Sequence, residues 1–187
     1  MNYYFLGFLA LAPWLAQAQS TYTYLIKGKV GHLTAPAKVY LVYGPQVLDS
    51  AALKNGQFEL KGTTQWPHSA ELVLERQGRL KEGLVNKRYV KSPDRASLFL
   101  EPGPVVVASA DSLVEAHVSG GQLTGDYQRL QTSLKPVISQ LKTARSQAQF
   151  DAASRQYGQA ELAFVKANPT SWVSLEVLQQ LRMFGPP

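Results

Sequence analysis

The stretch that decides the fold is Lys38-Val39-Tyr40-Leu41-Val42-Tyr43, followed by Asp49-Ser50-Ala51-Ala52-Leu53-Lys54-Asn55-Gly56-Gln57-Phe58-Glu59-Leu60-Lys61-Gly62. Val39, Leu41 and Tyr43 recur with the period of two that is typical of a half-buried strand. The pair Asn55-Gly56 can take the positive φ angles of a tight hairpin turn. We therefore predict strands over residues 37–43, 46–53 and 57–61, with a hairpin turn at Asn55-Gly56.

The same period of two continues on both sides of this stretch. Tyr22, Tyr24, Ile26 and Val30 alternate with polar residues, and Pro102-Gly103-Pro104 interrupts the pattern further along. Further strands are predicted over residues 70–75, 97–101, 105–109 and 114–118. Some eight short strands, with turns roughly every 8 to 12 residues, indicate an antiparallel β-sandwich.

After Gly120-Gly121 the apolar period changes to about 3.6, which predicts helices. Pro136 requires the first helix either to kink or to restart there. Pro169 ends the second helix, and the Ser171 hydroxyl can cap a third. The predicted apolar faces are Tyr127, Leu130, Leu134, Val137 and Leu141; Phe150, Ala153, Tyr157, Ala160 and Phe164; and Trp172, Leu175, Leu178 and Leu181.

The N-terminus reads as a secretory signal peptide. An apolar run from Tyr3 to Leu15 precedes Ala16-Gln17-Ala18, the small-x-small pattern at which a signal peptidase cleaves. We expect residues 1–18 to be removed, residues 19–120 to form the sandwich domain and residues 121–187 the helical segment. The predicted fold class is therefore mainly β with some α, and the signal peptide predicts a periplasmic or secreted protein. We expect no transmembrane segment in the mature part, because no later run approaches the roughly 20 apolar residues that span a bilayer.

Composition limits the chemistry. The chain has no cysteine, which excludes disulfides, thiolate metal sites and thiol-disulfide exchange by this polypeptide. The net charge of +6 is evenly spread, since residues 19–118 and residues 119–187 each carry an excess of +3. A nucleic-acid-binding face would concentrate that charge on one element, so we expect no nucleic-acid partner.

Several segments together resemble a known family. They are Tyr24-Leu25-Ile26-Lys27-Gly28-Lys29-Val30, Val39 to Tyr43, Asp49-Ser50-Ala51 with Asn55-Gly56-Gln57-Phe58 and Lys61-Gly62, Pro67, Leu98-Phe99-Leu100-Glu101-Pro102-Gly103, and Val118-Ser119-Gly120-Gly121. In order and spacing they resemble the N-terminal domain of unknown function of bacterial envelope thioredoxin-like thiol-disulfide oxidoreductases. The helical part, ending in residues 164–175, resembles the linker that follows that domain. In relatives a thioredoxin-fold domain with Cys-x-x-Cys comes next; it is absent here, so no catalytic residue of the family can be transferred.

The residues that could support catalysis or bind a metal are scattered. His32, His68 and His117 lack the short, fixed spacing that a zinc site or general base requires. Asp49-Ser50 and Asp111-Ser112 lie at strand edges, where such residues usually bond nearby backbone amides, and no Gly-x-Ser-x-Gly elbow is present. We predict no catalytic residue, no metal ligand and no cofactor.

A basic stretch between Glu75 and Arg95 is the least ordinary charged segment. It is interpreted either as a loop that contacts an anionic partner or as a solvated connection between two strands. The candidate binding residues are Arg76, Arg79, Lys81, Lys87, Arg88 and Lys91.

We therefore expect an exported, non-catalytic interaction or scaffolding module that binds an envelope protein or an anionic glycan. Two alternatives stay open. One is the detached front part of a thiol-disulfide oxidoreductase whose thioredoxin domain is missing or on another chain. The other is a hydrolase whose site is assembled from scattered Asp, Ser and His, which clustering of a histidine with a carboxylate in a concave pocket would favour.

Overall fold

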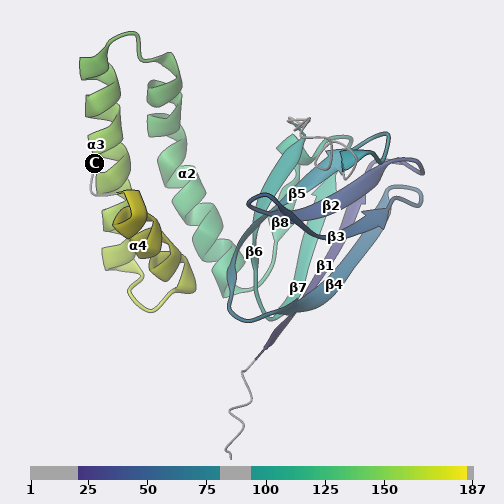
Figure 1. Ribbon diagram of the computed structural model, residues 1–187. Coiled ribbons are helices and arrows are strands. Elements are labelled where there is room, and N and C mark those ends of the chain that lie inside the picture. Colours follow the sequence, from purple (N-terminus) through teal and green to yellow (C-terminus); the bar gives the residue numbers. More distant parts are fainter. Residues whose placement is uncertain (1–20, 81–93, 185–187) are drawn as a thin grey trace, which may run out of the picture.

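The computed structural model describes residues 21–80 and 94–184, which form two four-stranded sheets followed by three α-helices (Figure 1). The predicted class, a sandwich followed by a helical segment, is confirmed. The elements are β1 Tyr22–Val30, β2 Lys38–Tyr43, β3 Gln46–Ala52, β4 Gln57–Thr64, β5 His68–Glu75, β6 Arg95–Leu100, β7 Gly103–Ser109, the 3₁₀ helix η1 Leu113–Glu115, β8 His117–Ser119, α2 Gln122–Thr143, α3 Gln147–Ala167 and α4 Trp172–Phe184.

The two sheets differ in their pairing. Sheet A has the strand order β4-β1-β7-β8, and sheet B has the order β3-β2-β5-β6. All pairs are antiparallel except β1 and β7, which run parallel with Ile26 opposite Val105. The expectation of a purely antiparallel sandwich is corrected at this one pair. Five strands of chain separate β1 from β7, which gives the long crossover that a parallel neighbour requires.

The Asn55-Gly56 turn has the predicted conformation and an additional role. Both residues have positive φ, 49° and 79°, and Lys54 and Gln57 exchange two backbone hydrogen bonds of 3.1 and 3.0 Å. However, β3 belongs to sheet B and β4 to sheet A. The turn therefore carries the chain from one sheet to the other, and the two strands pair only next to the turn.

The sandwich core lies between the inner faces of the two sheets. Every second residue of β1 and β4 points into it, as the period of two predicts. Its members with 1 % exposure or less are Ile26, Val30, Val39, Leu41, Leu53, Leu60, Leu72, Leu98, Leu100, Val105, Val107 and Leu113. Burial of this apolar surface, without any disulfide, provides the main stabilising term of the sandwich.

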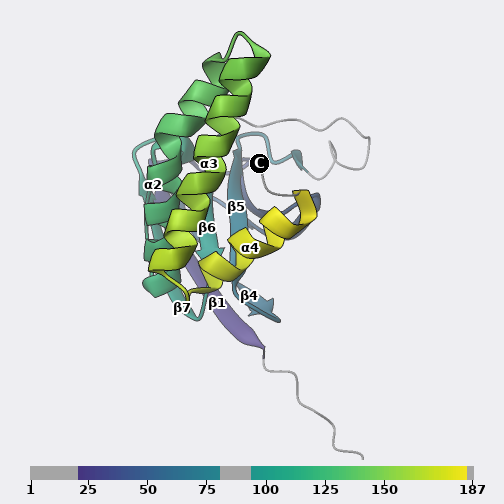
Figure 2. The same cartoon turned by 90° about the vertical axis from the view of Figure 1, so that its left-hand side faces the viewer.

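Sheet B is covered on its outer face as well. Phe99 of β6 is fully buried beneath the helices, in a second apolar cluster that includes Leu130, Leu134, Phe164 and Val173. Figures 1 and 2 show the helical layer standing against β5 and β6, with α3 on the far side of α2 from the sandwich. Among residues 21–80 and 94–184, no helix lies over the outer face of sheet A. None of the helices in the described ranges is long and apolar enough to cross a membrane.

The helices follow the predicted apolar faces in part. The predicted face of α2 packs in the helical cluster, and Pro136 lies inside one continuous helix, so no second helix starts there. Phe150 of α3, with 48 % exposure, and Leu175 and Leu178 of α4, with 43 % and 46 %, face outward against prediction. In α4, Val173 and Val177 are buried instead, because Glu176 on the same side of the helix bonds to sheet B and sets its rotation.

The predicted strand over residues 114–118 is wrong in its first half. Residues Leu113–Glu115 form η1, and the strand covers only His117–Ser119. The Ser112 hydroxyl accepts a hydrogen bond from Val114 N–H at 3.2 Å, which caps this short helix. The Asp94 carboxylate accepts from Leu113 N–H at 2.5 Å, so a partner distant in sequence supports the helical turn.

Buried polar groups attach the helices to the sandwich and to one another. Glu101, directly after β6, accepts hydrogen bonds from the N–H groups of Leu123 and Thr124, both at 3.0 Å. The carboxylate thus caps the N-terminus of α2, where a negative charge is favoured. The predicted Ser171 cap is confirmed, since its hydroxyl accepts from Val173 N–H at 3.3 Å and also donates to Asp126 of α2 at 2.6 Å.

Candidate functional site

Lysines dominate the outer face of sheet A. Lys27 and Lys29 of β1 and Lys61 of β4 are exposed at alternate strand positions, opposite the buried face of the same strands. Lys54, directly before the Asn55-Gly56 turn and opposite Gln57, is also exposed at the β4 side of this face. We call these four residues the lysine face. Glu59 is the single acidic residue at the strand positions of this side.

The strand register places small or apolar residues beside the lysines. Leu25, Lys27 and Lys29 of β1 lie opposite Pro104, Val106 and Ala108 of β7. Val106 is 46 % exposed although it is branched and apolar. The face therefore combines cationic tips with an apolar floor, and it can contact both the charges and the carbon skeleton of a partner.

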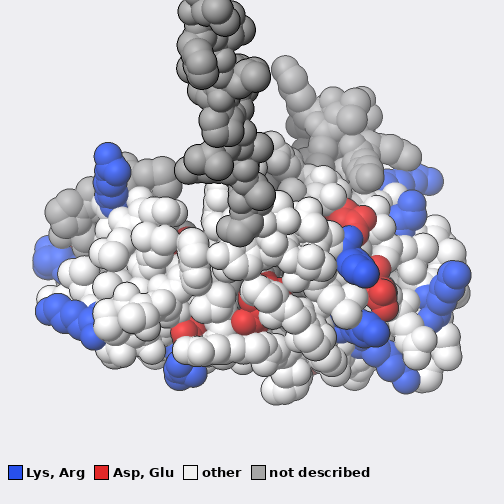
Figure 3. All heavy atoms as spheres, turned by 90° about the horizontal axis from the view of Figure 1, so that it is seen from below, with Lys and Arg blue, Asp and Glu red and all other residues white. Residues whose placement is uncertain are grey.

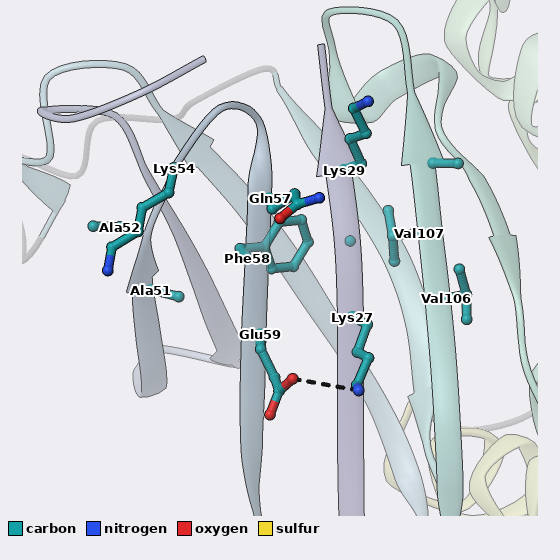
Figure 4. A pocket seen from close by; sticks show the side chains of 12 residues that line it. Lys27, Lys29, Ala51, Ala52, Lys54, Gln57, Phe58, Glu59, Val106 and Val107 are labelled. Atoms are coloured by element: carbon teal, nitrogen blue, oxygen red, sulfur yellow. Dashed lines mark ion pairs between the residues drawn. The ribbon is translucent and has the colours of Figure 1, made fainter. Parts of the chain in front are cut away.

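A groove of about 630 Å³ runs over this face towards β3. Figure 4 shows Lys27 and Lys29 on one strand, Gln57, Phe58 and Glu59 on the next, and Lys54 beyond them. Lys27 and Glu59 form an ion pair of 3.5 Å in which both side chains are more than half exposed, so water screens it and it contributes little stability. The groove is lined by Lys27, Gly28, Lys29, Ala51, Ala52, Lys54, Gln57, Phe58, Glu59, Val106, Val107 and Ala108.

The basic stretch predicted from the sequence is only partly described. Arg76 donates to the Asp111 carbonyl oxygen at 3.1 Å and lies 3.8 Å from the carboxylate of Asp94, so it links two segments of the sandwich. Arg79 is exposed. Lys81, Lys87, Arg88 and Lys91 lie outside the described residues. Cationic side chains are also spread over both the sandwich and the helices on the side seen in Figure 3, in keeping with an evenly distributed excess.

The three histidines lie in separate environments. His32 Nδ1 is 3.1 Å from the side-chain oxygen of Asn55, and His117 is exposed on β8. His68 is buried against the ring of Tyr43, at 4.4 Å between centroids, and its Nδ1 lies 2.9 Å from the carbonyl oxygen of Trp66. Within residues 21–80 and 94–184 no group of three or more His, Asp or Glu is arranged to hold a metal ion. The described hydrogen bonds and ion pairs join no histidine to a carboxylate.

A second polar cluster lies where the helices meet sheet B. Glu176 of α4 accepts a hydrogen bond from Ser69 N–H of β5 at 2.8 Å and another from the Ser69 hydroxyl. A small cavity of about 60 Å³ beside them is lined by Tyr127, Tyr157 and Glu161, among others. The lining contains two glutamates and no lysine, arginine or histidine.

Three ionisable groups of this junction, Tyr127, Tyr157 and Glu161, have raised pKa values, which favours their neutral forms. Burial raises the pKa of Glu161, which is 5 % exposed, and the hydrogen bond with Tyr157 offsets part of that rise. Burial also raises the pKa of Tyr127, with the negative charge of Glu176 as the next cause. The volume is too small for an organic substrate, and the junction fits a structural role better than a ligand site.

Sequence reasoning missed the lysine face because it searched for charge that is contiguous along the chain. Lys27, Lys29 and Lys61 belong to two strands, and the pairing of Lys27 with Glu59 and of Leu25 with Lys61 brings them onto one surface. The available signal was the alternation of lysine with buried residues in β1 and β4. That alternation predicts exposed lysines, but only the strand order shows that they lie together.

Comparison with known proteins identifies a family but no characterised relative. No curated protein and no solved structure matches the chain. A family described as "Domain of unknown function (DUF4369)" matches residues 24–127, which extend from β1 through the sandwich into the first turns of α2. Over more than half of its length, then, the chain belongs to the DUF4369 family.

Proposed function

We propose that this chain is an exported, non-catalytic interaction module of a bacterial envelope, and that it binds an anionic envelope component through the lysine face. The observation that carries the proposal is the asymmetry of the sandwich. Helices cover the outer face of sheet B, whereas no described helix or strand covers the outer face of sheet A, which has four lysines against Glu59 around a groove of about 630 Å³.

Clustered lysines favour a partner that carries several negative charges. Each exposed contact is weak and screened by salt, but several cations on one surface act together on a polyanion. The neighbouring apolar residues, Leu25 and Val106, add contact area that does not depend on salt. We therefore expect binding that falls, but does not vanish, as ionic strength rises.

The envelope location rests on the sequence. The apolar run before Ala16-Gln17-Ala18 has the form of a cleavable signal peptide. The resemblance to front domains of envelope thiol-disulfide oxidoreductases supports the same location. The same resemblance supports one alternative, a module that works beside a thioredoxin-fold domain on another chain. The redox step would then belong to that domain, because this chain has no cysteine with which to perform thiol-disulfide exchange.

The test measures binding of the purified chain to two defined polyanions, poly-L-glutamate and a polyuronate polysaccharide, over a range of salt concentrations. Replacing Lys27, Lys29, Lys54 and Lys61 together by glutamine is expected to lower affinity about tenfold or more and to flatten the salt dependence. The matched control replaces Arg76, Arg79, Lys87 and Arg88 by glutamine, which removes the same charge from the basic stretch.

The two quadruple variants decide between the two basic regions. If the control loses affinity and the lysine-face variant does not, the binding surface is the basic stretch. If the wild-type chain and both variants bind each polyanion equally well, the lysine face is not the binding surface. Turnover of an ester, peptide or glycan substrate by the purified chain rejects the non-catalytic part of the proposal.

A further inference from the structure

Strand β4 is an edge strand of sheet A, and its hydrogen-bonding direction can be assigned. Val30 N–H donates to the Gly56 carbonyl oxygen at 2.9 Å, directly across the β1–β4 pairing. In an antiparallel pair such bonded positions recur at every second residue. The backbone groups of Phe58, Leu60 and Gly62 therefore face β1, and those of the residues between them face outward.

Three consecutive outward positions of β4 are open. Gln57 uses its outward groups in the turn, where it exchanges two backbone bonds with Lys54. Glu59, Lys61 and Thr63 come next, and within the described residues no backbone bond to their outward N–H and carbonyl groups is made. Such a row of unpaired groups is a template for an added strand.

The lysines near this edge favour an added strand that carries negative charge. Lys61 lies on the edge itself, and Lys54 and Lys27 lie at the groove beside it. Glu59 is already paired with Lys27. At the turn end of the edge, the groove is bounded by the small residues Ala51 and Ala52 of β3, which leave room for side chains of an incoming segment.

We propose, resting on the function proposed above, that the partner is an acidic polypeptide segment that adds to the outer edge of β4 as an extended strand. The alternating donors and acceptors of Glu59, Lys61 and Thr63 match another polypeptide backbone, and a polysaccharide offers no such repeat. Acidic side chains at alternate positions of the segment point towards the lysine face and its groove, and those between them point to the opposite side of the sheet, where Phe58 lies.

The experiment measures binding of a short synthetic peptide in which glutamate alternates with threonine. A second peptide of identical sequence carries N-methyl groups at alternate backbone nitrogens, which keeps its charge and removes the donors that face β4. The wild-type chain is expected to bind the first peptide and to lose most of its affinity for the second.

The protein-side variant is Lys61→Pro, which removes one outward N–H and leaves the bonds to β1 in place. Its matched control is Lys61→Thr, which removes the same charge and keeps the N–H. We expect Lys61→Pro to bind the peptide about fivefold or more weakly than Lys61→Thr. Circular dichroism checks folding, and if Lys61→Pro does not fold, Thr63→Pro with Thr63→Ser as its control tests the same edge.

Five outcomes overturn the inference. Equal affinity for the two peptides, or equal affinity of the proline and threonine variants, rejects strand addition. Binding of the polyuronate but not of the peptide rejects the polypeptide partner and leaves the proposed function standing, whereas binding of neither polyanion rejects the proposed function itself. A dimer in analytical ultracentrifugation that Lys61→Pro converts to a monomer assigns the edge to a second copy of the chain.

Discussion

The carboxylate of Glu176 on α4 accepts a hydrogen bond from the backbone N–H of Ser69 on β5 at 2.8 Å, although the two residues are 107 positions apart in sequence. The Ser69 hydroxyl donates a second bond to the same carboxylate. Together with Val173 and Val177 on the same side of α4, this contact holds the last helix against sheet B.

Glu176→Ala is therefore expected to lower the free energy of unfolding by about 1–3 kcal/mol, because both Ser69 donors lose their partner at a half-buried site. Urea unfolding followed by circular dichroism measures the change. Gln179→Ala, at an exposed position of the same helix, is the control and should stay within about 0.5 kcal/mol of the wild type. Equal stability of the two variants would show that the hydrogen bonds between Ser69 and Glu176 do not stabilise the docking of α4.

Glu161 should make the stability of the helical layer depend on pH. Burial raises its pKa in the folded chain above the ordinary value of 4.5, so the folded state binds the proton more tightly than the unfolded state does. The contribution of this group is fully present below pH 4.5 and is lost as pH rises through the raised pKa.

Glu161→Gln imitates the protonated side chain and should raise the free energy of unfolding near neutral pH, with no gain well below pH 4.5. Urea unfolding of the variant and the wild type at both pH values provides the comparison. A gain of the same size at both would mean that ionisation of Glu161 is not its source.

Gly28 of β1 and Phe58 of β4 form a cross-strand pair in which the Phe58 ring occupies the space that a Cβ on Gly28 would need. We expect Gly28→Ala to destabilise the sandwich by about 1–3 kcal/mol, because the 6 % exposed ring has to move within a packed core. Thermal and urea unfolding test this.

Gly125→Ala serves as the comparison for that variant. Near the start of α2, its added Cβ meets only a side-chain nitrogen of Arg129 at 3.7 Å. The exchange should stabilise the helix by up to about 1 kcal/mol, since alanine is the better helix former. Loss of stability in Gly125→Ala and none in Gly28→Ala would contradict the packing argument.

Cleavage after Ala18 remains a prediction from the sequence. Intact mass spectrometry or N-terminal sequencing of the exported protein should find Gln19 as the first residue. Ala18→Arg, which places a bulky charged side chain at the cleavage position, should block processing, whereas Ala18→Gly should not. Full-length chain in the soluble envelope fraction would contradict the prediction.

Local chemistry in the sequence was sufficient for most of the strands, for the positions of the helices and for the turn at Asn55-Gly56. An Asn-Gly pair adopts positive φ angles at low cost, and the periods of 2 and about 3.6 reflect which side of a strand or helix is buried. The Ser171 cap depends on residues within two positions, so it too was predictable. The prediction of a strand over residues 114–118 was wrong in its first half, because the Leu113 N–H donates to Asp94, a partner 19 positions away in sequence.

Only the tertiary structure decided which sheet each strand joins and what lies on each face. Nothing in β3 and β4 indicates that their turn changes sheets, or that β7 pairs in parallel with β1. The orientation of α4 likewise follows from Ser69, and the lysine face from the register that brings Lys27 and Lys61 onto one surface. Local conformation depends on interactions between neighbouring residues, which can be read along the sequence. The contacts between distant residues depend on how the strands and helices pack, and the sequence pattern does not show this.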